Sequence, residues 1–121
     1  MSDRKPTNVV CLCGSTRFPE AFIEANRRET LAGSIVLSIG CDMRQDNSVF
    51  GATEAERRRT KAKLDVLHFR KIDLSDEVLV LNVGGYIGES TEREVEYAQS
   101  TGKRVRFLEY REAVYGIEEV K

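Results

Sequence analysis

The stretch DEVLVLNVGGYIGEST (residues 76–91) joins an apolar segment to a glycine-rich loop and then to the start of a helical pattern. Its first half, residues 76–83, predicts a strand buried on both faces, because apolar side chains follow one another without alternation. Gly84, Gly85 and Gly88 then permit positive φ and a close approach of the backbone to a ligand. The stretch therefore predicts a strand, a ligand-facing loop and a helix in succession.

The rest of the chain repeats this alternation of apolar strands and amphipathic helices, which predicts one α/β domain over residues 1–121. The expected strands are 8–14, 34–40, 76–83 and 104–110, and the expected helices are 17–33, 54–75 and 90–103. Right-handed crossovers then give a doubly wound parallel sheet, flavodoxin- or Rossmann-like, with strand order 2-1-3-4. A mobile loop is expected at 41–53, and residues 111–121 are compatible with a short helix, an arm or a fifth edge strand.

Size and charge narrow the class of protein. The chain has 121 residues and a net charge of −1, which gives no basic field for a nucleic acid polymer or a membrane surface. Its apolar runs are shorter than the roughly 20 residues of a membrane span. The polar N-terminus lacks a signal-peptide core, so we expect a cytoplasmic protein.

The chain has three cysteines, Cys11, Cys13 and Cys41. Cys11 and Cys13 lie two apart in a predicted strand and share a face, which does not suit a structural disulfide. With only His68 as a histidine, the sequence does not predict a zinc site, and we expect core thiols in a reducing compartment.

The first predicted strand ends in the loop CGSTRF (residues 13–18), at the sheet edge where ligands bind in this topology. Gly14, with Ser15 or Thr16 at a helix start, offers free N–H groups to an anion, and Arg17 adds a charged donor. The loop matches neither the Walker nor the dinucleotide motif. A plain helix N-cap is the alternative explanation.

The second loop, after residue 83, reaches the same edge and leads to four glutamates. Val95, Ala98 and Gly102 define the buried face of the following helix at 100° per residue, and Glu94 lies closer to the centre of that face than Glu92, Arg93 or Glu96. Glu94 is therefore the acid best placed to face the ligand. The alternative is a capping box, with Thr91 as N-cap and Glu94 at the third helical position.

Asp65 and His68 lie one turn apart on the helix that precedes the third strand, so they share a face. An imidazole can serve as an acid near neutral pH. The alternative is that His68 is structural or exposed.

Four stretches, CLCGSTRF, IVLS, KIDLSDEVLVLNVGGYIGEST and REVEYAQSTGKRV, together resemble the nucleoside 2-deoxyribosyltransferase-like superfamily. That superfamily includes the 2'-deoxynucleoside 5'-monophosphate N-glycosidases, and the resemblance spans residues 8–110. It implies cleavage or exchange of the base–sugar bond, with Glu94 as the nucleophile. It also implies an acid on the helix before the third strand, where His68 stands in place of the family's aspartate.

The stretch GGYIGESTERE is also similar to the Gly-Gly-x-Gly-Thr-x-x-Glu motif of cytokinin-activating phosphoribohydrolases, although Ile87 and the Ser90–Thr91 pair interrupt it. Two alternatives to the N-glycosidase or transferase therefore stay open among nucleotide ligands. One is a phosphoribohydrolase-like enzyme, and the other is a non-catalytic nucleotide-binding or sensing module. A third alternative is that both loops are merely helix starts.

The enzyme hypothesis assigns each candidate residue a role. Glu94, His68 and Asp65 are catalytic, and no cofactor or metal is expected. The residues expected to bind the nucleoside or nucleotide are Gly14, Ser15, Thr16, Arg17, Gly85, Gly88, Glu89 and Ser90. The resemblance further implies a homodimer or a larger homo-oligomer.

Overall fold

The structure is a computed structural model that describes residues 6–39, 50–109 and 119–120. Most of the loop predicted at 41–53, including Cys41, lies outside the described residues. The elements in chain order are β1 (Val9–Cys13), α1 (Pro19–Leu31), β2 (Ile35–Leu37), α2 (Glu54–Leu74), β3 (Glu77–Val80), a 3-10 turn (Val83–Gly85), α3 (Glu89–Ser100), β4 (Arg104–Phe107) and β5 (Glu119–Val120).

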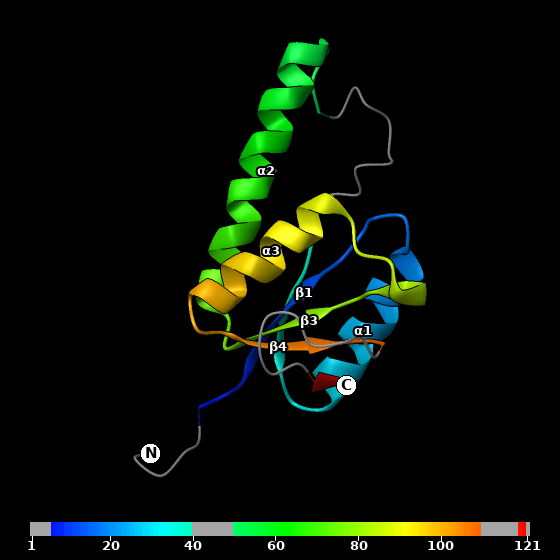
Figure 1. Cartoon of the computed structure of the whole chain (residues 1–121), viewed down its shortest axis with the longest axis vertical. Coiled ribbons are helices and arrows are strands. Elements are labelled where there is room, and N and C mark those ends of the chain that lie inside the picture. Colours follow the sequence, from blue (N-terminus) through cyan, green and yellow to red (C-terminus); the bar gives the residue numbers. More distant parts are fainter. Residues whose placement is uncertain (1–5, 40–49, 110–118, 121) are drawn as a thin grey trace.

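The strands form one parallel sheet in the order β2-β1-β3-β4-β5 (Figure 1). The predicted order of the first four strands is therefore confirmed. The sequence left three possibilities for the C-terminal residues. The structure describes two of these residues, 119–120, and they pair with β4 as a short edge strand. Because β1 and β3 are neighbours, the loops that follow them meet at one edge of the sheet.

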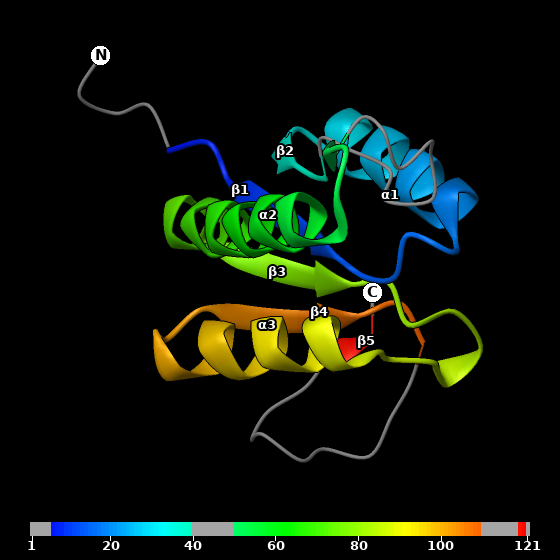
Figure 2. The same cartoon turned by 90° about the horizontal axis from the view of Figure 1, so that it is seen from above.

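Helices cover both faces of the sheet, with α1 on one side and α2 and α3 on the other (Figure 2). Alternate residues of β1 divide between these layers, because successive side chains of a strand point to opposite faces. Val10 and Leu12 pack with Phe22 on the α1 side, whereas Cys11 and Cys13 join the core under α2 and α3. In the part of the chain that is described, no helix combines the length and the apolar character needed to cross a bilayer.

Two helices begin at residues other than those the sequence predicts. Helix α1 starts at Pro19 rather than at 17, because proline suits the first helical position, and its N-cap is Phe18. Helix α3 starts at Glu89 rather than at 90, and its N-cap is Gly88. Both shifts bear on the site, because each helix follows one of its loops.

A buried charged network lies on the α1 side, near the amino ends of β1 and β3. Arg106 of β4 donates to Glu29 of α1 and to Glu77 of β3, at 2.7 Å in each case. Asn8 donates to the second oxygen of Glu77 at 2.6 Å. We call these four residues the Arg106 network; its ionic contacts join one helix to two strands far from the ligand-binding edge.

Candidate functional site

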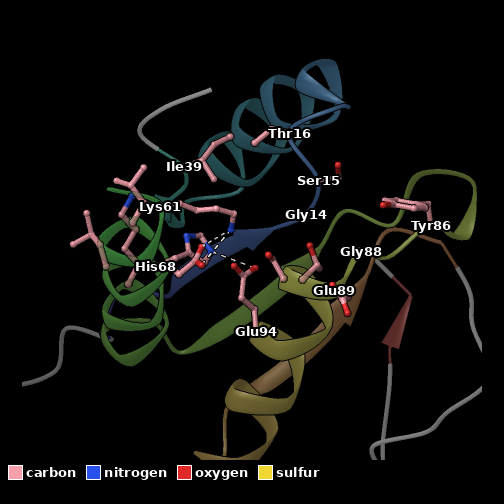
Figure 3. Close-up of a pocket in the computed structure, with 16 residues that line it drawn as sticks. Gly14, Ser15, Thr16, Ile39, Lys61, His68, Tyr86, Gly88, Glu89 and Glu94 are labelled. Atoms are coloured by element: carbon pink, nitrogen blue, oxygen red, sulfur yellow. Dashed lines mark hydrogen bonds and ion pairs between the residues drawn. The ribbon is translucent and has the colours of Figure 1, made fainter. Parts of the chain in front are cut away.

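A pocket of about 400 Å³ opens at the carboxyl edge of the sheet, between α2, α3 and the loops after β1 and β3 (Figure 3). This volume lies within the range of small-molecule sites. The residues that line it are Gly14, Ser15, Thr16, Ile39, Lys61, Leu64, Asp65, Leu67, His68, Lys71, Tyr86, Gly88, Glu89, Ser90, Thr91 and Glu94. The two loops singled out in the sequence therefore meet at one cavity.

The first turn of α3 forms one wall of this pocket. Its N-cap, Gly88, has no side chain to cap the helix, and Gly88, Glu89, Ser90 and Thr91 all line the cavity. The N–H groups of a first turn have no partner within the helix, so this wall suits an anionic or hydroxyl ligand. The alternative in which Thr91 and Glu94 form a capping box is wrong, because the helix begins before Thr91.

The loop after β1 forms a turn rather than the helix start that was expected at Ser15 or Thr16. The Ser15 Oγ accepts a hydrogen bond from the Arg17 N–H, and the Ser15 carbonyl accepts one from Phe18, both at 3.2 Å. Gly14 lies in a crowded position, because a Cβ there would be 3.1 Å from the Cβ of Leu81. This turn brings the hydroxyls of Ser15 and Thr16 to the pocket.

Tyr86, in the loop after β3, contacts both the loop after β1 and the start of α3. The Arg17 guanidinium stacks on its ring at 4.3 Å from the centroid, and Phe18 packs edge-on at 6.1 Å. Its hydroxyl lies over Gly88, where a Cβ would be 3.2 Å away. Arg17 therefore holds a lining residue in place but does not itself line the pocket.

Glu94 and His68 face each other across the pocket floor. Glu94 Oε1 lies 3.8 Å from His68 Nε2, and the two side chains are only 14% and 8% exposed (Figure 3). They come from α3 and α2, which pack together on this face of the sheet. Val95 and Ala98 are buried as predicted for this face of α3, with Glu94 at its pocket side. Gly102 does not belong to the face, because the helix ends at Ser100 and Gly102 is exposed in the turn that follows.

Two cysteines of β1 lie directly beneath this pair. Cys13 Sγ is 3.4 Å and Cys11 Sγ is 3.7 Å from the same His68 Nε2, and both thiols are free and fully buried. We call Cys11, Cys13, His68 and Glu94 the Cys-His-Glu cluster. Its atoms are polarisable or ionisable, and it borders a solvent-accessible pocket.

The electrostatics of this cluster follow from mutual hydrogen bonding and burial. A hydrogen bond from the Cys13 thiol, helped by His68, lowers the pKa of Cys11 to about 6 against the effect of burial. The same bond and burial raise the pKa of Cys13 well above its ordinary value. Burial lowers the pKa of His68, but Cys11 and Glu94 outweigh it and the net shift is upward. Burial raises the pKa of Glu94, while the neighbouring imidazole opposes that rise.

The remaining charged groups of the pocket lie mainly on α2. Lys61 and Asp65 form an exposed pair at 3.2 Å, so the Asp65 carboxylate is held at the rim. Lys71 donates to the Ser38 carbonyl at 2.6 Å and thereby ties α2 to the segment after β2. The cavity is thus lined by charges of both signs.

Most of the residues predicted for the site line this pocket. Glu94, His68, Asp65, Gly14, Ser15, Thr16, Gly88, Glu89 and Ser90 do so, whereas Arg17 and Gly85 do not. Gly85 instead has a positive φ of 82° in the 3-10 turn and shapes the loop. The sequence reasoning missed Tyr86, Lys71 and the two cysteines, and a Cys-x-Cys strand ending in a ligand loop was the available signal for the cysteines.

Two comparisons with known proteins assign no family to this chain. A scan against protein-family models and a search of curated proteins each find no match to this chain. The pocket, its residues and the sequence motifs are therefore the evidence on function.

Proposed function

We propose that the protein is an N-glycosidase or glycosyl transferase that acts on the base–sugar bond of a nucleoside or its 5'-monophosphate. The observation that carries this proposal is the position of Glu94. Its carboxylate is nearly buried, faces a 400 Å³ pocket and does not cap its helix. A carboxylate of this kind is suited to attack an anomeric carbon.

The chemistry then proceeds in two balanced steps. Glu94 attacks C1' of the sugar, the C1'–N bond breaks, and its electron pair passes to the departing base. The base takes a proton from His68, with Asp65 at the rim as the second acid of the pocket. Water then attacks C1' of the glycosyl–Glu94 ester, its proton passes to the His68 imidazole that the first step left neutral, and the C1'–O bond to Glu94 breaks to restore the carboxylate. In a transfer, an acceptor base attacks C1' in place of water and gives up its proton in the same way.

Substrate binding falls to the two loops. The open first turn of α3, from Gly88 to Ser90, and the hydroxyls of Ser15 and Thr16 bind the sugar–phosphate part. Glu89 accepts hydrogen bonds from sugar hydroxyls. Arg17 acts through Tyr86, whose ring it supports.

The test is the release of free base from a panel of nucleosides and nucleoside 5'-monophosphates, in the ribose and the deoxyribose series. Base released by the wild-type protein and not by Glu94→Gln supports the proposal. The phosphoribohydrolase-like alternative predicts release from ribonucleotides alone. Tight nucleotide binding without any release would instead favour the non-catalytic sensing module, and neither binding nor release would leave both loops as helix starts.

The oligomeric state is a separate part of the proposal. We infer a homo-oligomer from the family resemblance alone, and light scattering measures it directly. A monomeric mass in solution would contradict this part without touching the role of Glu94.

A further inference from the structure

We propose that Cys11, Cys13 and His68 bind a Zn²⁺ ion beneath the pocket, with the Glu94 carboxylate as the fourth ligand. The site itself goes beyond the proposed function and does not rest on it, whereas its expected effect on activity does. Cys11, Cys13 and His68 are all buried. The cysteines belong to β1, and His68 belongs to α2, at least 55 positions further along the chain.

The spacing of the donor atoms matches tetrahedral coordination. The two Sγ atoms and His68 Nε2 all lie within 4.8 Å of one another, and the sulfur–nitrogen distances are 3.4 and 3.7 Å. Bonds of about 2.3 Å to sulfur and 2.0–2.1 Å to nitrogen place such donors about 3.5 Å apart around a tetrahedral ion. The two sulfur–nitrogen distances are therefore already close to those around a bound ion.

The donor set selects the class of ion. Thiolate and imidazole ligands suit Zn²⁺ and exclude the hard cations Mg²⁺ and Ca²⁺, which take oxygen ligands. Glu94 approaches from the remaining side, with its Oε1 3.8 Å from His68 Nε2. Its carboxylate does not lie within 4.8 Å of all three other donors, so it has to turn toward the ion to bind it. Carboxylate oxygen is an established zinc ligand, so the cluster provides four donors for one ion.

A disulfide is the competing use of two neighbouring thiols, and the strand geometry opposes it. Cys11 and Cys13 pair in consecutive same-face positions with Val78 and Val80 of β3. Such positions are about 6.6 Å apart along a parallel strand, whereas a disulfide needs Cβ atoms about 3.5–4.5 Å apart. The pair is therefore better placed to share an ion than to form a bond.

Occupancy of this site would bear on catalysis. The ion takes the Nε2 of His68 and an oxygen of Glu94, which are the atoms that the proposed function uses as acid and nucleophile. The zinc-loaded protein is then inactive as an N-glycosidase, and removal of the ion restores activity. The cluster in this way links a soft metal ion to the state of the pocket.

The experiment is a titration of the reduced, chelator-treated protein with Co²⁺, whose tetrahedral thiolate complexes absorb strongly in the visible and near ultraviolet. We expect one equivalent to bind with thiolate charge-transfer bands, and Zn²⁺ to displace it. Cys11→Ser and Cys13→Ser each weaken these bands, because each removes one of the two Co–S bonds, whereas Cys41→Ser, which removes the third thiol, leaves their intensity unchanged. Absence of bands in the wild type, or their loss only in Cys41→Ser, would overturn the proposal.

Two further measurements guard against variants that fail to fold. Circular dichroism checks each variant, and His68→Asn tests the site without altering β1. We expect His68→Asn to weaken Co²⁺ binding at least tenfold, and unchanged affinity there contradicts the site. Glu94→Gln is also expected to weaken binding about tenfold but to keep the charge-transfer bands, and unchanged affinity removes Glu94 as a ligand.

The binding readout is independent of activity, so the two proposals fail separately. Co²⁺ bands without base release from any substrate keep the ion site and reject the glycosidase. Base release without Co²⁺ binding does the reverse. If both occur, one equivalent of Zn²⁺ abolishes release in the wild type and chelation recovers it, and release that continues with the site loaded contradicts the proposed blocking of His68 and Glu94.

Discussion

Two polar clusters are buried on opposite faces of the same sheet, and they are built differently. In the Arg106 network, an arginine between two glutamates makes contacts of 2.7 Å, and every carboxylate involved has a strong donor. In the Cys-His-Glu cluster, one imidazole nitrogen lies 3.4 to 3.8 Å from two sulfurs and a carboxylate oxygen. The contacts of the Arg106 network are short hydrogen bonds. The contacts of the Cys-His-Glu cluster are longer, and this cluster borders a pocket.

This difference separates stability from chemistry. Buried charges that are paired with one another contribute to stability as a set. Removal of one member leaves the other charges buried without that partner, which reduces stability. Groups held loosely beside a cavity keep their lone pairs available for a ligand or a reacting atom. We therefore expect substitutions in the Arg106 network to reduce stability, and substitutions in the Cys-His-Glu cluster to reduce activity.

The largest effect is expected for Glu94→Gln, which preserves shape and removes the nucleophile. Base release should fall at least about 10⁴-fold, equivalent to about 5.5 kcal/mol of barrier. The free energy of unfolding should change by less than about 1 kcal/mol, because the substitution also removes a charge that burial disfavours. Steady-state kinetics and urea unfolding measure the two quantities.

Glu96→Gln is the matched control for this variant. It makes the same chemical change on the same helix, but the side chain is exposed. Its activity and stability should both stay near those of the wild type. A stable Glu94→Gln protein with full activity would show that Glu94 is not the nucleophile, and the comparison of the two clusters would lose its catalytic side.

The next largest effect is expected for Arg106→Met in the closed network. Glu29 and Glu77 would then lose the cation that they share and keep the more distant Arg28 at 3.7 Å and Arg104 at 4.0 Å. Their side chains are only 10% and 8% exposed. Breaking a buried ionic unit in this way costs about 3–5 kcal/mol of stability. The expected result is a fall of that size in the free energy of urea unfolding, with base release unchanged under conditions where the variant is folded.

Arg104→Met on the same strand controls for the loss of an arginine. Its side chain is 56% exposed and reaches Glu77 only at 4.0 Å. Exposed ion pairs contribute about 0–1 kcal/mol, so we expect a loss within that range. Equal losses in the two variants would mean that burial does not distinguish the Arg106 contacts.

Two Thr-x-x-Glu motifs show how far sequence could predict this site. Thr53 and Glu56 form a reciprocal capping box at the start of α2, whereas Thr91 and Glu94 do not form one. The difference is the position of the N-cap, which Gly88 provides for α3 three residues before Thr91. Local sequence fixes the motif, but loop packing fixes where the helix begins, so only the structure separates a capping glutamate from a pocket glutamate.

The strand order and the meeting of the two loops were predictable, because they follow from apolar periodicity and crossover handedness. The face of Glu94 followed from the helical repeat. The cysteine cluster could not be predicted in this way, because His68 comes from a helix far along the chain and its distance to β1 depends on tertiary packing. Tyr86 was missed for a related reason, since its place over Gly88 depends on the loop conformation.

A smaller effect is expected for His68→Gln, which keeps a hydrogen-bonding side chain but cannot donate a proton as an acid. Base release should fall about 10²-fold, equivalent to about 2.7 kcal/mol of barrier. Substrate binding should change much less, because the two loops bind the sugar–phosphate part. The measurement is kcat separated from KM with the metal-free protein.

Asp65→Asn is the companion variant, because its carboxylate lies at the rim and is paired with Lys61. It should lose less activity than His68→Gln if the inner residue is the principal acid. The reverse order would transfer that role to Asp65. Loss of stability without loss of rate in His68→Gln would place His68 with the structural residues.

The smallest effect is expected at the capping box formed by Thr53 and Glu56. This exposed polar contact is the reference with which the two buried clusters can be compared. The Thr53 hydroxyl accepts from the Glu56 N–H at 3.1 Å, and the Glu56 carboxylate accepts from the Thr53 N–H at 3.0 Å. Thr53→Ala should lower the free energy of unfolding by about 1 kcal/mol. Thr60→Ala makes the same change inside α2, keeps the cap, and should stay within about 0.5 kcal/mol of the wild type. Both variants should release base at the wild-type rate, since Thr53 and Thr60 do not line the pocket. A loss at Thr53 as large as that at Arg106 would mean that burial is not what distinguishes the closed network.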